Sequence, residues 1–257
     1  MIKKVILLNN ELEKDIQRLA NSLNFPLILV LTSKYFVTNN HIYPNERKYN
    51  IFAFCHILFL NAICLYRICT MDITDVNMSP IESHILCFFN ILNYLSFAFV
   101  FTMINNIVFL ILNLQTIHRS INFSKNIRNF IIWNWISITT IIITNIIIFT
   151  IYYVTLKSSY DINHLLAIIC DITFIALDVN LVISIRLMLL LRKYVEAWIK
   201  EILMMKDGHE NEQENNERYV RLFGIYQNIF KAYNMYKKLF QVLVSISCGH
   251  GNIIEYL

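Results

Sequence analysis

Three charged residues interrupt a long apolar stretch in the second half of the chain. Asp171, Asp178 and Arg186 lie within residues 165–191, which carry no other charge. Because Asp171 and Asp178 are seven residues apart, close to two turns of an α-helix, they share one helical face. At the centre of a membrane-spanning helix each charge costs about 2.5–3.5 kcal/mol, and such residues pair with one another or mark a functional site. Arg186 lies two turns further on, near enough to the helix end to snorkel.

Two interpretations of these charges remain open. In the first they are structural and pair with Asn105, Asn106 and Asn145 on neighbouring apolar stretches. In the second they line a hydrated cavity that opens to the outside and binds a small molecule, because polar and aromatic residues recur at a similar depth on three stretches. The predicted lining residues are Asn90, Asn93, Tyr94, Asn145, Tyr152, Asp171, Phe174 and Asp178.

The composition predicts the membrane elements that position these residues. Hydrophobic residues make up 56% of the chain and charged residues 16%, whereas a soluble domain carries about a quarter charged residues. Only helices and closed barrels satisfy the backbone in lipid, and the long uninterrupted apolar runs favour helices. We therefore expect an all-α polytopic membrane protein with four full spans at 51–68, 85–112, 130–156 and 165–191. A fifth span begins at 239 and is cut short by the polar, glycine-rich residues 247–252.

The distribution of lysine and arginine predicts the orientation. The loop at 69–84 contains none, whereas residues 1–49 and 193–238 are rich in both. By the positive-inside rule the amino terminus is cytosolic. The sequon at Asn77 then lies outside and is a candidate for glycosylation. The expected organisation is a cytosolic segment at 1–49, a four-span bundle at 50–192, a cytosolic helical hairpin at 193–238, and a truncated fifth span with a divergent tail at 239–257.

Both cytosolic segments show helical periodicity. Leu12, Ile16, Leu19, Ala20 and Leu23 recur at helical spacing and predict an amphipathic helix on the inner leaflet or on other cytosolic helices. In the hairpin, the fourth helix continues about three turns into the cytosol, and a polar break at 206–212 precedes an aromatic-rich stripe. The apolar residues on these two arms of the hairpin either pack within the chain or join subunits. The interface residues that we predict are Trp198, Ile202, Tyr219, Phe223, Tyr226, Phe230 and Tyr233.

Motifs for enzymatic chemistry are missing from the sequence. There is no serine-hydrolase elbow, no zinc-protease helix and no phosphate-binding loop, and the six cysteines and seven histidines lack metal-ligand spacing. We expect no catalysis, no cofactor, no metal and no nucleic-acid partner. Membrane lipid and a small external molecule are the expected partners.

Residues 190–244 resemble the insect gustatory receptors, particularly those of moths and butterflies. The resemblance is carried by Arg192-Lys193-Tyr194, Trp198-Ile199, Arg218-Tyr219, Ile225-Tyr226-Gln227-Asn228-Ile229 and Lys237-Lys238-Leu239-Phe240-Gln241-Val242-Leu243, and by Asn39-Asn40-His41-Ile42-Tyr43-Pro44 before the first span. It implies a plasma-membrane subunit with a cytosolic amino terminus, a ligand site in the outer half and a cytosolic layer that joins four subunits around a cation channel. The pore-lining seventh helix of that family, with its Thr-Tyr and Gln-Phe signature, is absent, so the resemblance implies a carboxy-terminally truncated channel.

Three functions follow as expectations. The first is a taste-receptor subunit that senses a small molecule, and the second is a non-conducting subunit that assembles with full-length receptors, as homo- or hetero-tetramers. The third, a G-protein-coupled receptor, is disfavoured by the predicted orientation and by the lack of an Asp-Arg-Tyr-like tripeptide after the third span.

Overall fold

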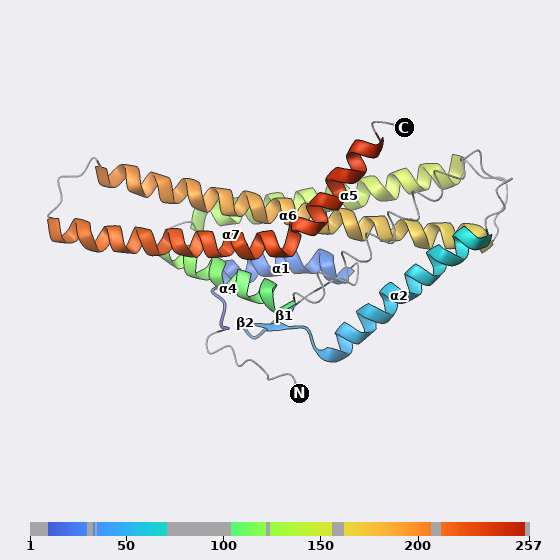
Figure 1. Cartoon of the computed structure of the whole chain (residues 1–257), viewed down its shortest axis with the longest axis horizontal. Coiled ribbons are helices and arrows are strands. Elements are labelled where there is room, and N and C mark those ends of the chain that lie inside the picture. Colours follow the sequence, from blue (N-terminus) through green and yellow to red (C-terminus); the bar gives the residue numbers. More distant parts are fainter. Residues whose placement is uncertain are drawn as a thin grey trace.

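The computed structural model of the chain describes residues 10–29, 33, 35–70, 104–121, 124–155, 162–206 and 212–254. This part of the chain forms helices and one small β-hairpin, which confirms the predicted all-α class. The elements, in order, are α1 (Lys14–Leu29), β1 (Tyr35–Thr38), β2 (His41–Pro44), α2 (Arg47–Thr70), α4 (Ile104–Ser120), α5 (Ser124–Thr155), α6 (Ile162–Lys206) and α7 (Glu212–Ile254). In Figure 1, α5, α6 and α7 run along the length of the molecule, and α1 and α4 lie beside them.

Helix α6 is a single helix of 45 residues that includes the predicted fourth span and its predicted cytosolic extension. Its end at Lys206 and the start of α7 at Glu212 bracket the predicted polar break. The two helices then run back along each other, as expected of the hairpin (Figure 1). Helix α7 passes the predicted start of a fifth span at 239 and remains helical to Ile254, beyond the glycine-rich residues.

Buried apolar residues at alternating spacings of three and four hold α7 against α4 and α6. Along α7 this seam consists of Leu222, Ile225, Ile229, Ala232, Tyr236 and Leu239, each at most 7% exposed. Spacings of this kind keep one face of a helix towards its neighbours. Hydrogen bonds fix the register, because Asn113 of α4 donates to the carbonyl of Asn228 at 2.7 Å. The hydroxyls of Ser184 and Tyr236 lie 2.9 Å apart between α6 and α7.

Helix α1 is the amphipathic helix that the sequence predicts, and its apolar face packs on protein. Ile16, Leu19, Ala20 and Leu23 are buried, in contact with a core that includes residues of α4, α5 and α6. The sequence left open whether this face lies on the inner leaflet or on other helices, and the structure shows it packed on other helices.

A proline inside α1 explains one long-range hydrogen bond. Pro26 has no N–H to donate to the carbonyl four residues earlier, which belongs to Ser22. That buried carbonyl instead accepts a hydrogen bond from Nδ2 of Asn134 on α5 at 3.1 Å. Because an unpaired buried carbonyl is costly, the pair couples the position of α1 to that of α5.

The β-hairpin at 35–44 was not predicted. Asn39 and Asn40 both have positive φ, 51° and 64°, which is the backbone of a two-residue hairpin turn that asparagine tolerates. Tyr35 is fully buried, its hydroxyl donates to the carbonyl of Ala20 at 2.7 Å, and burial raises the pKa of the phenol. The hairpin therefore links α1 to the start of α2.

One helical segment among the described residues is long and apolar enough to cross a membrane. It is Ile127–Ile151 of α5, which overlaps the predicted third span at 130–156, and only 11% of its most apolar 18-residue stretch is buried inside the protein. The predicted spans at 51–68 and 165–191 fall in α2 and α6, whose side chains are described only in part, and most of 85–112 lies outside the described residues.

Candidate functional site

Asn145 of α5 and Asp178 of α6 form a polar pair in the apolar part of the molecule. Nδ2 of Asn145 donates to Oδ2 of Asp178 at 3.2 Å and to the carbonyl of Ile141 at 3.1 Å. Both side chains are half-buried, and the apolar Ile142 and Ile175 are part of the surrounding packing. The predicted pairing of Asp178 with an asparagine of a neighbouring apolar stretch is therefore present. A carboxylate held in this way is oriented to accept a further hydrogen bond or a cation.

The other predicted lining residues lie outside the part of the chain whose side chains the structure describes. Asn90, Asn93 and Tyr94, and the sequon at Asn77, lie outside the described residues. Tyr152 belongs to α5, and Asp171 and Phe174 to α6, but their side chains also fall outside what the structure describes, as do those of Asn105 and Asn106. The described part of the site is the Asn145–Asp178 pair.

Arg186 reaches away from Asp178 along α6. Its Nη2 donates to the carbonyl of Phe130 at 3.1 Å, and its guanidinium carbon lies 4.6 Å from the centre of the Phe130 ring. Nζ of Lys193 lies 5.9 Å from the same ring. Since Phe130 is near the start of α5, the side chain of Arg186 extends towards the predicted cytosolic end, as its predicted snorkelling requires.

The predicted interface residues separate into two groups. Trp198 belongs to the α6–α7 contact, because its Nε1 donates to the carbonyl of Leu222 at 2.8 Å and its ring lies 5.3 Å from that of Tyr226. Ile202 is partly buried beside it. The other five are 41–60% exposed and form what we call the aromatic stripe, which consists of Tyr219, Phe223, Tyr226, Phe230 and Tyr233.

The aromatic stripe follows the same spacing as the buried seam but is displaced by one residue. Its members are four, three, four and three residues apart, and Phe223 and Phe230 each follow a buried seam residue directly. One residue corresponds to a rotation of about 100° around the helix. Helix α7 therefore has one apolar face packed within the chain and a second, aromatic face that is exposed.

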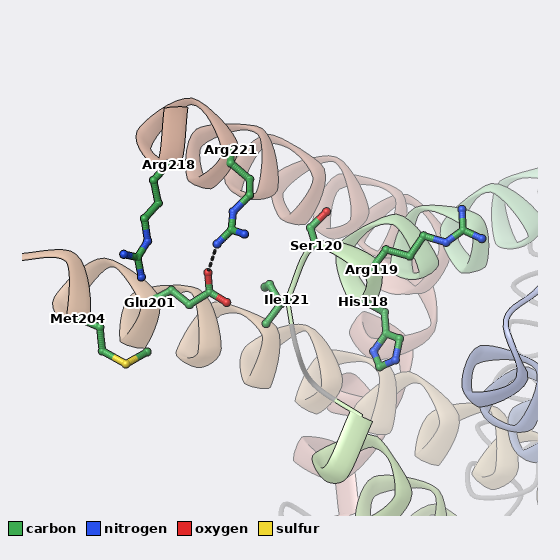
Figure 2. A pocket seen from close by; sticks show the side chains of 8 residues that line it. All are labelled: His118, Arg119, Ser120, Ile121, Glu201, Met204, Arg218 and Arg221. Carbon is green, nitrogen blue, oxygen red and sulfur yellow. Dashed lines mark hydrogen bonds and ion pairs between the residues drawn. The ribbon is translucent and has the colours of Figure 1, made fainter. Parts of the chain in front are cut away.

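A cavity between α4, α6 and α7 was not predicted (Figure 2). Its volume is about 530 Å³, and it is lined by His118, Arg119, Ser120, Ile121, Glu201, Met204, Arg218 and Arg221. Arg221 pairs with Glu201 at 3.1 Å, whereas Arg119 pairs at 2.6 Å with Glu13, which is not in the lining. The lining combines both arms of the α6–α7 hairpin with the distant end of α4, so no local motif could have indicated the cavity.

His118 is the most buried of the polar and charged residues in this lining. It is 9% exposed, and burial lowers the pKa of its imidazole, an effect that the nearby carboxylates of Asp15 and Glu13 oppose. Its Nδ1 has no hydrogen-bond partner among the described residues. A buried polar atom of this kind normally awaits a water molecule or a ligand.

Comparisons with protein-family models, with curated proteins and with solved structures found no match. The resemblance of residues 190–244 and the geometry described above are therefore the basis for assigning a function.

Proposed function

We propose that this chain is a multi-pass plasma-membrane subunit of a chemoreceptor that resembles the insect gustatory receptors. The observation that carries the proposal is the Asn145–Asp178 pair, a carboxylate held by an amide between two long apolar helices. An ionisable residue at membrane depth is costly and is by default a candidate for ligand or ion recognition. We further propose four crossings, at 51–68, 85–112, 130–156 and 165–191, with the amino terminus in the cytosol.

The exposed side chains of α5 support a lipid environment. Its isoleucines at 143, 146, 147, 148 and 151 are each at least 50% exposed. Helix α2 also exposes large apolar side chains, among them Phe52, Leu58 and Phe59. Monomeric soluble proteins seldom expose continuous apolar surface of this extent. In a bilayer, exposing the same surface costs no hydrophobic free energy, because the surrounding lipid acyl chains are also apolar.

Two tryptophans support a position for the inner membrane boundary. Trp133 and Trp135 of α5 are 59% and 38% exposed, and the ring of Trp135 lies 5.4 Å from that of the exposed Phe25 at the end of α1. Tryptophan is enriched where headgroups meet hydrocarbon. We therefore propose that the boundary lies near Trp133, with α1 just beneath it and Arg128 in the cytosol.

Fluorescence quenching tests this placement, because the chain has only three tryptophans. In nanodiscs that contain brominated phosphatidylcholine, the Trp198→Phe variant keeps Trp133 and Trp135, and its emission should be strongly quenched. The matched Trp133→Phe/Trp135→Phe variant keeps only Trp198 in the cytosolic hairpin, and its emission should be almost unaffected. Equal quenching of the two variants would contradict the proposed boundary.

The Asn145–Asp178 pair is tested by the response to tastants. The chain is expressed with a full-length gustatory receptor, and calcium entry is measured over a panel of sugars and plant alkaloids. For an active compound, Asp178→Leu should raise the half-maximal concentration at least about tenfold, because a hydrogen bond to a charged group contributes about 1.5–3 kcal/mol. Asp178→Asn keeps the shape and should have a smaller effect.

The control for this experiment is Glu196→Gln, which removes a carboxylate from the same helix at its exposed ion pair with Arg192. It should leave the response unchanged. An unaltered response of Asp178→Leu, with normal amounts at the cell surface, would remove the pair from ligand recognition.

The aromatic stripe favours a second candidate function, that of a non-conducting subunit. Its exposed aromatic side chains suit assembly with another receptor chain whether or not this chain binds a tastant. Co-purification with a full-length receptor, together with no change in that receptor's response to any tastant, would favour this alternative.

A further inference from the structure

The cavity of Figure 2 lies where the seam between α6 and α7 changes from apolar to charged. Along α7 the spacing of three and four continues backwards from Leu222 to Arg218. Along α6 the corresponding series runs through Tyr194 and Trp198 to Glu201. A packed helical pair normally fills such positions with apolar side chains, so charged residues here mark a polar site within the helical layer.

The charges of the lining favour an anionic ligand. The guanidinium groups of Arg218 and Arg221 lie beside a single lining carboxylate, that of Glu201, whereas Arg119 points away from it and pairs with Glu13 (Figure 2). Arg218 and Arg221 are three residues apart on α7 and therefore project on the same side of the helix. Guanidinium groups bind phosphate oxygens through paired, charge-assisted hydrogen bonds. The volume of about 530 Å³ falls within the range of small-molecule sites.

We propose that this cavity binds a phosphorylated anion, with Arg218 and Arg221 as its main contacts and Glu201 as an internal competitor. In the structure the carboxylate of Glu201 forms an ion pair with Arg221, with 3.1 Å between Oε2 and Nη2. A phosphate would take the place of this carboxylate. His118 lines the α4 side of the cavity, and its buried Nδ1 has no partner among the described residues. The bound anion would join the end of α4 to the hairpin of α6 and α7.

The depth of the cavity bears on where the phosphate comes from. Glu201 is ten residues beyond the predicted cytosolic end of the fourth span at 191, a rise of about 15 Å along α6. The headgroup region on each side of a bilayer is only about 5–8 Å thick. A soluble phosphorylated metabolite therefore suits the site better than a lipid headgroup. This argument from depth rests on the proposed orientation, whereas the argument from charge does not.

The test measures binding to the full chain in nanodiscs by calorimetry, with inorganic tripolyphosphate as the soluble probe and discs containing phosphatidylinositol bisphosphate as the lipid arm. Arg218→Gln and Arg221→Gln should each weaken tripolyphosphate binding at least about tenfold. Glu201→Gln should strengthen binding, because the competing carboxylate is removed. If the arginines had a purely structural role, the arginine and glutamate variants would not change the tripolyphosphate affinity in opposite directions.

Matched controls are available in the exposed ion pair between Arg192 and Glu196 on α6. Arg192→Gln and Glu196→Gln change the same charges on α6 outside the lining and should leave the affinity unchanged. Binding only to the phosphoinositide discs, with the same dependence on the variants, would support the phosphate site and assign it to a lipid. Absence of binding to both probes, or affinities unaffected by all three cavity variants, would overturn the proposal. Neither result depends on the tastant response, so failure here is distinguishable from failure of the receptor assignment.

Discussion

Replacing Phe223 and Phe230 together with alanine is expected to abolish assembly of this chain with itself or with a full-length receptor, while leaving its thermal stability almost unchanged. Both side chains are more than half exposed in the aromatic stripe, so truncation leaves no internal cavity. If the stripe is an interface, each ring is a candidate hot spot worth about 2 kcal/mol, or roughly thirtyfold in affinity. Co-purification from detergent and cross-linking in membranes measure the loss.

Trp198 is a poorer choice for this experiment, although the sequence pattern places it in the same predicted interface. Its indole N–H donates to the carbonyl of Leu222, and its ring contacts Tyr226. Removing it would disturb the α6–α7 packing and lower assembly indirectly. Phe223 and Phe230 avoid this ambiguity.

The control is Glu217→Ala/Lys231→Ala, a double variant of two exposed residues on the polar side of α7. It preserves the net charge and should leave assembly intact. If the double phenylalanine variant assembles as well as this control, the aromatic stripe is not a subunit interface.

The division of α7 into two faces shows what helical periodicity can and cannot indicate. The sequence correctly places apolar residues on one side of the helix, but their arc covers both the seam and the stripe. Tyr226 and Ile229 are three residues apart within this arc, yet Tyr226 is 44% exposed and Ile229 is 5% exposed. An arc wider than the roughly 100° needed for one neighbour was the available signal that two partners are served.

Helix positions and the long α6 follow from local pattern, because periodicity and the lack of breakers act within one segment. The long-range polar contacts do not. Asn134 completes the hydrogen bonding that Pro26 leaves open, although the two residues are more than a hundred positions apart. The cavity at Arg218 depends in the same way on three helices that only the fold brings together.

The Asn145–Asp178 pair lies between these extremes. Both residues stood out as polar groups in apolar stretches, and two antiparallel neighbouring helices place them at similar depth. The sequence could not decide whether they pair or remain apart. Their hydrogen bond is compatible with both the structural and the ligand-binding interpretation, so the response of Asp178→Leu is the deciding measurement.

Leu114→Ala is expected to be among the most destabilising single truncations in the described core. Leu114 of α4 is fully buried in the core that α4 shares with α1, α5, α6 and α7, so its removal leaves a cavity as well as losing the burial of three carbons. Such changes cost about 2–5 kcal/mol, which lowers the melting temperature of a chain of this size by on the order of 10 °C. Thermal unfolding in detergent, followed by size-exclusion chromatography, measures the shift.

Thr116→Ala provides the comparison two residues along the same helix. Thr116 is exposed, and its hydroxyl bonds only to the carbonyl of Leu112 within α4, at 3.2 Å. Its loss should change the stability by less than about 0.5 kcal/mol. Equal melting temperatures for the two variants would mean that Leu114 is not packed in this core.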